Sequence, residues 1–289
     1  MPEETKKTED EANWLEITVA PSTPPDFRTH SNYVSFMKEL SEELKITLNF
    51  SIDSRATFKK ILLNKKLGLI KIIKENLDDE HKKSLQDRDF GKICSIWIPV
   101  KSYYLVFNLL LVLCSLINDD YRNLNYSHKD SIVNSRKLIK DGKISFNKHG
   151  FNRVFTCLEA ESFKAKMGDN LRYGVEEESR IREIIKKICR YKFESYCRDE
   201  KVEEFRTKKN RIKRDEFFRK NEISLFEFFY WYRIKTNYRD LSFLDQDILS
   251  SEIVDFYENY YSLTINFYNA LKDLINESSK KRFGEKIIL

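Results

Sequence analysis

The sequence is poor in the residues that turn a chain sharply. Its 289 residues include only 7 glycines and 5 prolines, too few for a sandwich or barrel whose many strands are joined by tight turns. Lysine, glutamate, leucine, isoleucine, asparagine and aromatic residues dominate instead, and this composition favours helices. With 34% charged and 41% hydrophobic residues, the chain is expected to form a soluble globular protein with a sizeable core.

Cysteine pairs at metal-ligand spacing are also lacking. The five cysteines are odd in number and contain no Cys-x-x-Cys pair, which argues against a disulfide framework or a zinc site and predicts a cytoplasmic protein. The sequence has no Gly-rich phosphate loop, no His-Glu-x-x-His and no Gly-x-Ser-x-Gly, the patterns of several common enzyme classes. We therefore expect neither a metal nor another cofactor.

A membrane span is not expected either. The N-terminal "MPEETKKTEDEAN" is hydrophilic and unlike a signal peptide. The apolar run from Tyr103 to Ile117 contains Asn108 and Ser115 and is shorter than the roughly 20 apolar residues that cross a bilayer. An element that is apolar on nearly every side must be surrounded by others, so the helix from Trp97 to Ile117 is predicted to be the innermost one.

The spacing of apolar residues predicts an all-α, up-and-down helical bundle. Residues 1–30 are expected to be a flexible tail, in which 14–20 form a short strand or docking segment, and 31–289 a single domain with a basic helical insertion at 143–222. The expected core helices are 56–77, 97–118, 128–140, 224–238 and 250–276.

Other helices and one connection complete this prediction. Helices are expected over 33–48 and 151–166, one long basic helix or two over 176–220, and a polar connection over 78–92. Ser224 and Glu227 form a capping-box pattern before an aromatic helix. The last helix has a long apolar stripe at 4-3 spacing that suits antiparallel packing, made of Ile253, Tyr257, Tyr260, Thr264, Phe267, Leu271 and Leu274.

Three stretches resemble one family. "SYYLVFNLLLVL" (102–113) has a tyrosine pair followed by a phenylalanine and apolar residues, and "SHKDSIVNSRKLIKDGKI" (127–144) a histidine, a short helix and a glycine turn. "YWYRIKTNY" (230–238) has an arginine, a small residue, an amide and a tyrosine, with Asn237 where aspartate is usual. Together they resemble the HEPN superfamily of prokaryotic helical bundles, so the bundle is expected to be of HEPN type.

The resemblance implies a candidate active site. In nuclease members, an arginine and a histidine separated by four to six residues form the active motif, and Arg122, Asn123 and His128 match it. A histidine can move protons near neutral pH, and an arginine can hold a phosphate as charge develops. Asn123 could orient the histidine or donate to the phosphate. One such motif per chain is a thin catalytic set, so the resemblance also implies a homodimer.

A basic stretch of the sequence suggests that the partner is a nucleic acid. Residues 180–220 contain 16 Lys/Arg and 8 Asp/Glu, the uneven charge that contact with a phosphate backbone requires; the alternative is a solvated helix face. The candidate RNA-binding residues are Lys208, Lys209, Arg211, Lys213 and Arg214.

Three functions remain open at this point. The first is a metal-independent endoribonuclease, a toxin-antitoxin or antiviral-defence effector held silent by a partner such as an antitoxin. The second is a non-catalytic HEPN module that binds RNA, a nucleotide or a partner protein such as a nucleotidyltransferase. The third is a structural helical adaptor. His128 itself could be a residue of a helix-capping turn.

Overall fold

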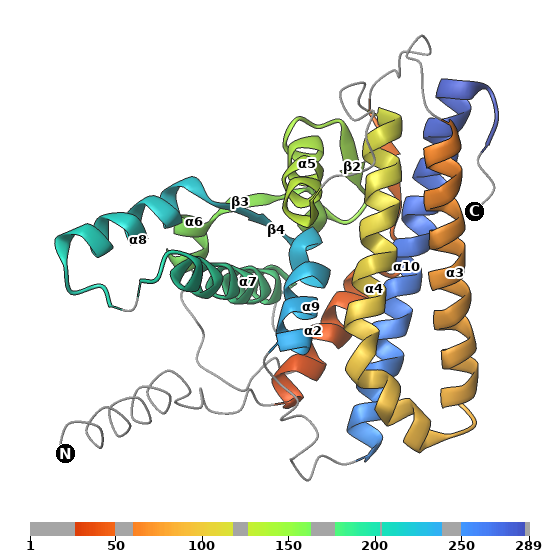
Figure 1. The fold of residues 1–289 in the computed structure, drawn as a ribbon, viewed down its shortest axis with the longest axis horizontal. Coiled ribbons are helices and arrows are strands. Elements are labelled where there is room, and N and C mark those ends of the chain that lie inside the picture. The colour runs from red at the N-terminus through yellow and green to blue at the C-terminus, as the bar shows by residue number, and fades with distance from the viewer. Residues whose placement is uncertain are drawn as a thin grey trace, which may run out of the picture.

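Nine α-helices and four short strands make up the described part of the chain (Figure 1). The computed structural model describes residues 27–49, 60–117, 127–162, 177–202, 204–238 and 250–286. The helices are α2 (Phe27–Leu40), α3 (Lys60–Ser84), α4 (Arg88–Ile117), α5 (His128–Lys140), α6 (Cys157–Ser162), α7 (Glu177–Asp199), α8 (Lys208–Lys220), α9 (Phe228–Tyr238) and α10 (Ser250–Phe283). The strands are β1 (Ile46–Leu48), β2 (Ile144–Phe146), β3 (Val154–Thr156) and β4 (Glu222–Ser224). The predicted all-α helical bundle is confirmed.

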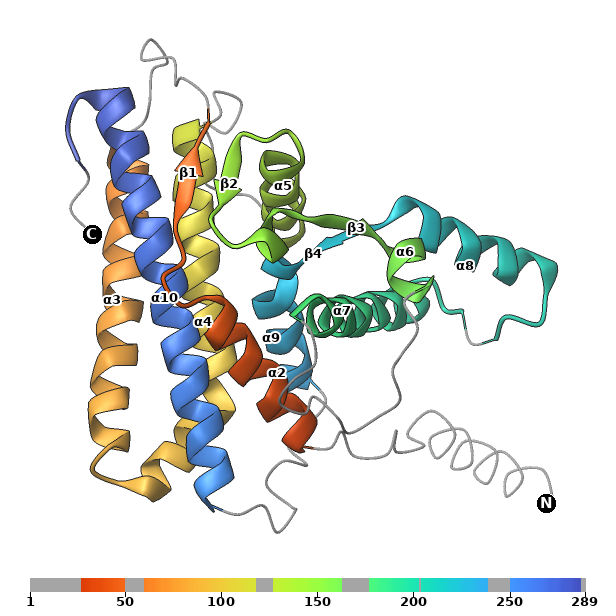
Figure 2. The same ribbon diagram turned by 180° about the vertical axis from the view of Figure 1, so that it is seen from behind.

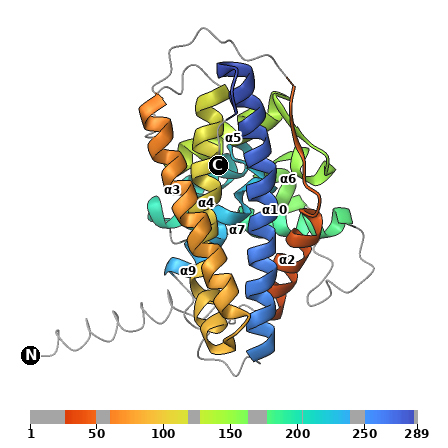
Figure 3. The ribbon, with the colours of Figure 1, turned by 90° about the vertical axis from the view of Figure 1, so that its right-hand side faces the viewer.

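Helix α4 lies at the centre of the bundle, between α3 and α10, and also packs against α9 and α5 (Figures 1 and 3). It is antiparallel to α3, with which it forms a helical hairpin. It is parallel to α10: the hydroxyl of Thr264 donates to Ser102 Oγ over 2.7 Å, and Arg282 Nη1 donates to the Leu116 carbonyl over 2.7 Å near the other end. The stripe predicted on α10 is buried in this core, although α10 runs parallel to its main partner.

The apolar character of α4 is explained by its central position. It is the one described helix long and apolar enough to cross a membrane, and most of its apolar stretch is buried inside the protein. Residues 105–117 are all buried. The prediction of an innermost helix is wrong at its first turn, because Trp97 is 54% exposed and the helix already begins at Arg88.

The predicted polar connection at 78–92 is wrong. Both helices of the hairpin run through it, because their charged residues face solvent and form pairs such as Lys74–Asp78, 2.6 Å apart. The true turn is short, and Asp87 caps the start of α4: its Oδ1 accepts from the backbone N–H groups of Asp89 and Phe90 over 3.0 and 3.1 Å.

Two antiparallel ribbons replace helix that the sequence predicted. The helix expected over 33–48 ends at Leu40, and β1 then pairs with β2 so that Thr47 lies opposite Ser145. The described part of the helix expected over 151–166, up to Ser162, is the end of a 3-10 turn (His149–Asn152), then β3 and the short α6. The strand expected at 14–20 lies outside the described residues.

The two strands of the second ribbon, β3 and β4, are the points where an arm leaves the bundle and returns to it. Strand β3 pairs with β4, Phe155 opposite Ile223, and the chain between them forms α6, α7 and α8. Helix α8 and the far end of α7 project away from α3, α4 and α10 (Figures 1 and 2). A cluster of aromatic side chains holds α7 and α8 together, among them Phe193 and Phe217, whose ring centroids are 5.1 Å apart.

Candidate nucleic-acid site

His128 is the first residue of α5, and Ser127 caps that helix. The side-chain oxygen of Ser127 accepts from the backbone N–H of Asp130 over 3.2 Å, so the capping role that the sequence left open for His128 belongs to its neighbour. The other two predicted motif residues, Arg122 and Asn123, lie outside the described residues. Their place beside His128 stays a prediction.

The imidazole of His128 packs against the aromatic face of α4. Its Nδ1 forms a hydrogen bond with the hydroxyl of Tyr103. Its ring lies 4.3 Å from that of Phe107 and 5.8 Å from that of Tyr104, edge-on to the latter. His128 is half-buried. Its Nδ1 is taken by the Tyr103 hydroxyl, so Nε2 is the ring nitrogen left for a ligand.

Two cations complete the cluster. The guanidinium carbon of Arg233, on α9, lies 4.9 Å from the Tyr103 ring centroid and 5.3 Å from that of Tyr104, within range of a cation–π contact. On α3, Lys66 Nζ donates to Asn108 Oδ1 over 3.3 Å. We call Lys66, Tyr103, Tyr104, Phe107, His128 and Arg233 the histidine cluster.

The electrostatics of the histidine cluster favour an anion. Burial lowers the pKa of His128, and the positive charges of Arg233 and Lys66 lower it further, so the imidazole is neutral at pH 7. Burial raises the pKa of Tyr103, which stays protonated. A neutral histidine beside two cations offers charge and hydrogen bonds that suit a phosphate group.

The direction of the Tyr103–His128 hydrogen bond decides what Nε2 can do. If the Tyr103 hydroxyl accepts from Nδ1–H, Nε2 has a free lone pair and can take a proton. If the hydroxyl donates to Nδ1, Nε2 carries the proton and donates a hydrogen bond.

The predicted RNA-binding residues all lie on α8, away from the histidine cluster (Figure 1). Lys213 pairs with Glu200 at 2.8 Å, and Arg214 with the neighbouring Asp215 at 2.9 Å. Lys208 and Lys209 are exposed in the first turn, with no ion pair to any described residue. The structure therefore separates the predicted residues into two places and does not bring α8 to His128.

Sequence reasoning missed five of the six members of the histidine cluster as site residues: Lys66, Tyr103, Tyr104, Phe107 and Arg233. The tyrosine pair 103–104 and Arg233 were noticed as marks of a family, and nothing at those positions indicated that they would meet His128. No family model matches the chain, and no curated protein or solved structure matches it either. The part of the chain that the structure describes holds no group of three or more His, Cys, Asp or Glu side chains suited to a metal ion.

A prediction about the arm follows from the two exposed lysines. Replacing both Lys208 and Lys209 with glutamine should reduce the salt dependence of RNA binding, because each lost phosphate contact lowers the slope of log K against log salt by about 0.7 for a single strand. The loss of affinity should be alike for unrelated sequences, since phosphate contacts carry no base information. Fluorescence anisotropy at several salt concentrations measures both.

The matched control changes Lys71 and Lys82 to glutamine. These lysines are exposed on α3, outside the arm, and their loss alters the net charge equally. The prediction is contradicted if the slope falls by the same amount in the control, or if it stays unchanged in the arm variant. Either result would mean that α8 is a solvated helix face.

Proposed function

We propose that the protein is a metal-independent endoribonuclease of HEPN type, a cytoplasmic toxin or antiviral-defence effector. One observation carries this proposal: His128, neutral at pH 7 and anchored by Tyr103, lies beside the cations Arg233 and Lys66. A proton acceptor next to positive charge is what attack on a phosphodiester requires. The predicted Arg122 would add a further cation.

The chemistry uses two histidines. Nε2 of His128 takes the proton of a ribose 2′-hydroxyl while its oxygen attacks the phosphorus, and the bond from phosphorus to the 5′-oxygen breaks. A second imidazole, in its protonated form, gives its proton to that leaving oxygen. The products are a 2′,3′-cyclic phosphate and a 5′-hydroxyl. The bound phosphate offsets the charge of Arg233 and Lys66 and so raises the pKa of an adjacent histidine, which supplies the protonated form.

The second histidine would come from a second copy of the chain. Exposed apolar side chains near the turn of the α3–α4 hairpin support a homodimer: Leu85 follows α3, and Ile93 and Trp97 lie one turn apart on α4. Tyr104, two turns beyond Trp97 on the same helix, belongs to the histidine cluster. A second copy packed on this face would lie next to the site.

The second candidate is a non-catalytic module that binds RNA, a nucleotide or a partner protein such as an antitoxin or nucleotidyltransferase. It is favoured by the tautomer in which the Tyr103 hydroxyl donates to Nδ1 of His128. In that tautomer Nε2–H donates to a phosphate oxygen and cannot act as a base.

Cleavage of labelled tRNA and mRNA in the presence of EDTA tests the proposal. The wild type should cut RNA, and His128→Ala should lose at least about 100-fold in rate, the low end for removing an acid–base group. The variant should stay folded, with a modest loss of stability from its ring packing and one hydrogen bond. Sedimentation of the same samples should show a dimer.

His149→Ala is the control, because His149 is exposed on the 3-10 turn before β3 and outside the histidine cluster. Its activity should equal that of the wild type. If the wild type binds RNA without cutting it, the second candidate is favoured. If it neither binds nor cuts RNA, the structural adaptor is the function that remains.

A further inference from the structure

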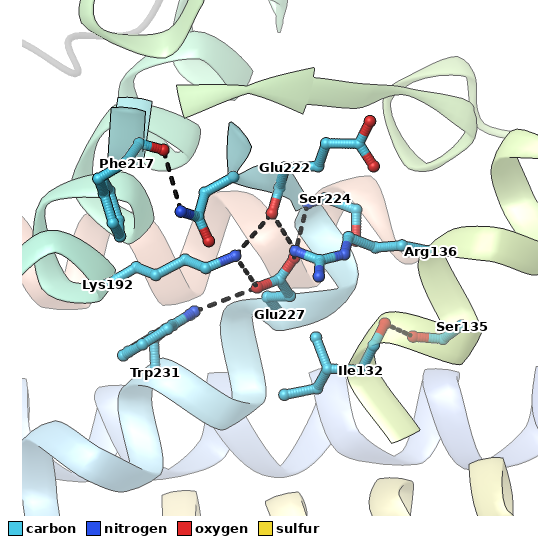
Figure 4. A network of polar contacts seen from close by, with 10 residues as sticks. Ile132, Ser135, Arg136, Lys192, Phe217, Glu222, Ser224, Glu227 and Trp231 are labelled. Carbon is cyan, nitrogen blue, oxygen red and sulfur yellow. Dashed lines mark hydrogen bonds and ion pairs between the residues drawn. The ribbon is translucent and has the colours of Figure 1, made fainter. Parts of the chain in front are cut away.

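Glu227 has a buried carboxylate that joins three parts of the fold (Figure 4). It is 2% exposed and belongs to the capping box that starts α9. Its oxygens accept from the Ser224 backbone N–H over 3.1 Å, from Arg136 Nη1 over 2.9 Å and from Trp231 Nε1 over 3.4 Å. Lys192 Nζ lies 4.0 Å away. One carboxylate thus contacts cations from α5 and α7 at the start of α9.

The two cations share a second acceptor. Lys192 Nζ donates to the backbone carbonyl of Glu222 over 2.8 Å, and Arg136 Nη1 donates to the same oxygen. The side chain of Glu222 turns outward to Lys140, so Glu227 supplies the negative charge that faces both buried cations. A buried charge left without its partner is strongly destabilising, and this carboxylate therefore holds α5 and α7 firmly against the start of α9.

Helices α5 and α9 also carry two members of the histidine cluster, His128 and Arg233. His128 precedes Arg136 by eight residues on α5, about 12 Å along the helix, and Arg233 follows Glu227 by six residues, about 9 Å. Arg136 meets Glu227 at one end, and His128 and Arg233 meet at Tyr103 at the other. The α5 and α9 segments therefore run antiparallel and are tied at both ends.

We propose that Glu227 and Arg136 are positioning residues, which set the separation of His128 from Arg233 and Tyr103 without touching a ligand. The expected effect on catalysis rests on the proposed function. The effect on the position of His128 relative to Arg233 and Tyr103 does not. Without this tie, α5 would be free to shift along α9 and carry His128 away from the cation and the hydroxyl. A shift of 1 Å in a site can cost about 100-fold in rate.

Histidine titration by NMR distinguishes positioning from a plain charge effect. Glu227→Gln removes a negative charge, and through space that loss alone would lower the pKa of His128. If the variant instead lets His128 move away from Arg233 and into solvent, burial and the charge of Arg233, two of the three causes of its lowered pKa, weaken, and the pKa rises. The proposal expects the rise, together with a fall in kcat of about 100-fold at unchanged KM.

Arg136→Lys is the second variant, since it keeps the charge and loses the planar fork. Any rise in the His128 pKa there comes from position alone. Lys140→Met, which breaks only the outer pair with Glu222, should leave His128 unchanged. His81 is an internal reference because it stacks on Tyr261 of α10, with ring centroids 3.8 Å apart, and is not part of the histidine cluster.

The outcomes separate the two proposals. An unchanged or lowered pKa of His128 in both folded variants excludes positioning, whatever the cleavage assay shows. A raised pKa in a protein whose wild type cuts no RNA keeps the positioning role and removes the nuclease. A rise in the pKa of His81 as well would mean general loosening of the fold, and this too would overturn the inference.

Discussion

Replacing Leu110 with aspartate is expected to leave no folded protein. Leu110 is 5% exposed in the C-terminal half of α4, the helix against which α3, α5, α9 and α10 pack. An unpaired carboxylate there must be buried without a partner or protonated, either of which costs several kcal/mol, against a total stability of about 5–15 kcal/mol. Circular dichroism and urea titration should show an unfolded or molten chain.

Ile72→Asp is the matched control for this experiment. Ile72 is 58% exposed on α3, so its aspartate reaches water and should change the free energy of unfolding by about 0.5 kcal/mol or less. A Leu110 variant that unfolds at the same urea concentration as the wild type would show that α4 is not the innermost helix.

Replacing Arg233 with methionine is expected to lower RNA cleavage by about 100- to 1,000-fold, the usual loss when a group that stabilises developing charge is removed. It should also raise the pKa of His128, because a neighbouring positive charge disfavours the protonated imidazole. Cleavage needs the neutral form, so the acidic limb of the pH–rate profile should move to higher pH. Rates measured between pH 5 and 8 show both effects.

Arg233→Lys and Arg88→Met complete that experiment. The lysine keeps the charge but not the planar fork, so the pH profile should stay near that of the wild type while the rate falls. Arg88 is exposed at the first residue of α4, and its loss should change neither. A wild-type pH profile in Arg233→Met would mean that Arg233 does not act on His128.

Strong periodic patterns predicted the helices whose apolar stripes face a single core. The 4-3 stripe of α10 is buried as expected, α5 spans 128–140 as predicted, and Ser224 and Glu227 form the capping box. The prediction failed over 78–92, where charged, solvent-facing residues made a helical segment look like a polar connection. It also failed where a short strand forms only because it pairs with a segment far away in the sequence. Strand β1 needs β2, nearly a hundred residues away.

The candidate site could be predicted only in part from the sequence, because its members come from helices that meet through tertiary packing. A short motif can point to His128. Its place after an apolar helix suggested the C-terminal end of α4, whereas His128 packs against Tyr103 and Phe107 in the middle of that helix. The contact with Arg233 could not be read from the sequence, because it depends on how α5 and α9 pack against α4. The roles of Arg122 and Asn123 stay predictions.

The parallel arrangement of α4 and α10 has a consequence for synthesis on the ribosome. Residues 118–249 separate the two helices, so α4 is made long before the helix that covers it. Contacts this distant in sequence form slowly, and a chain without them exposes apolar surface. The hairpin of α3 and α4 must therefore wait, with one side uncovered, until α10 emerges. A nascent chain lacking α10 has no complete bundle on which to hold His128, Tyr103 and Arg233 together, so any activity of this site begins only once translation has passed α10.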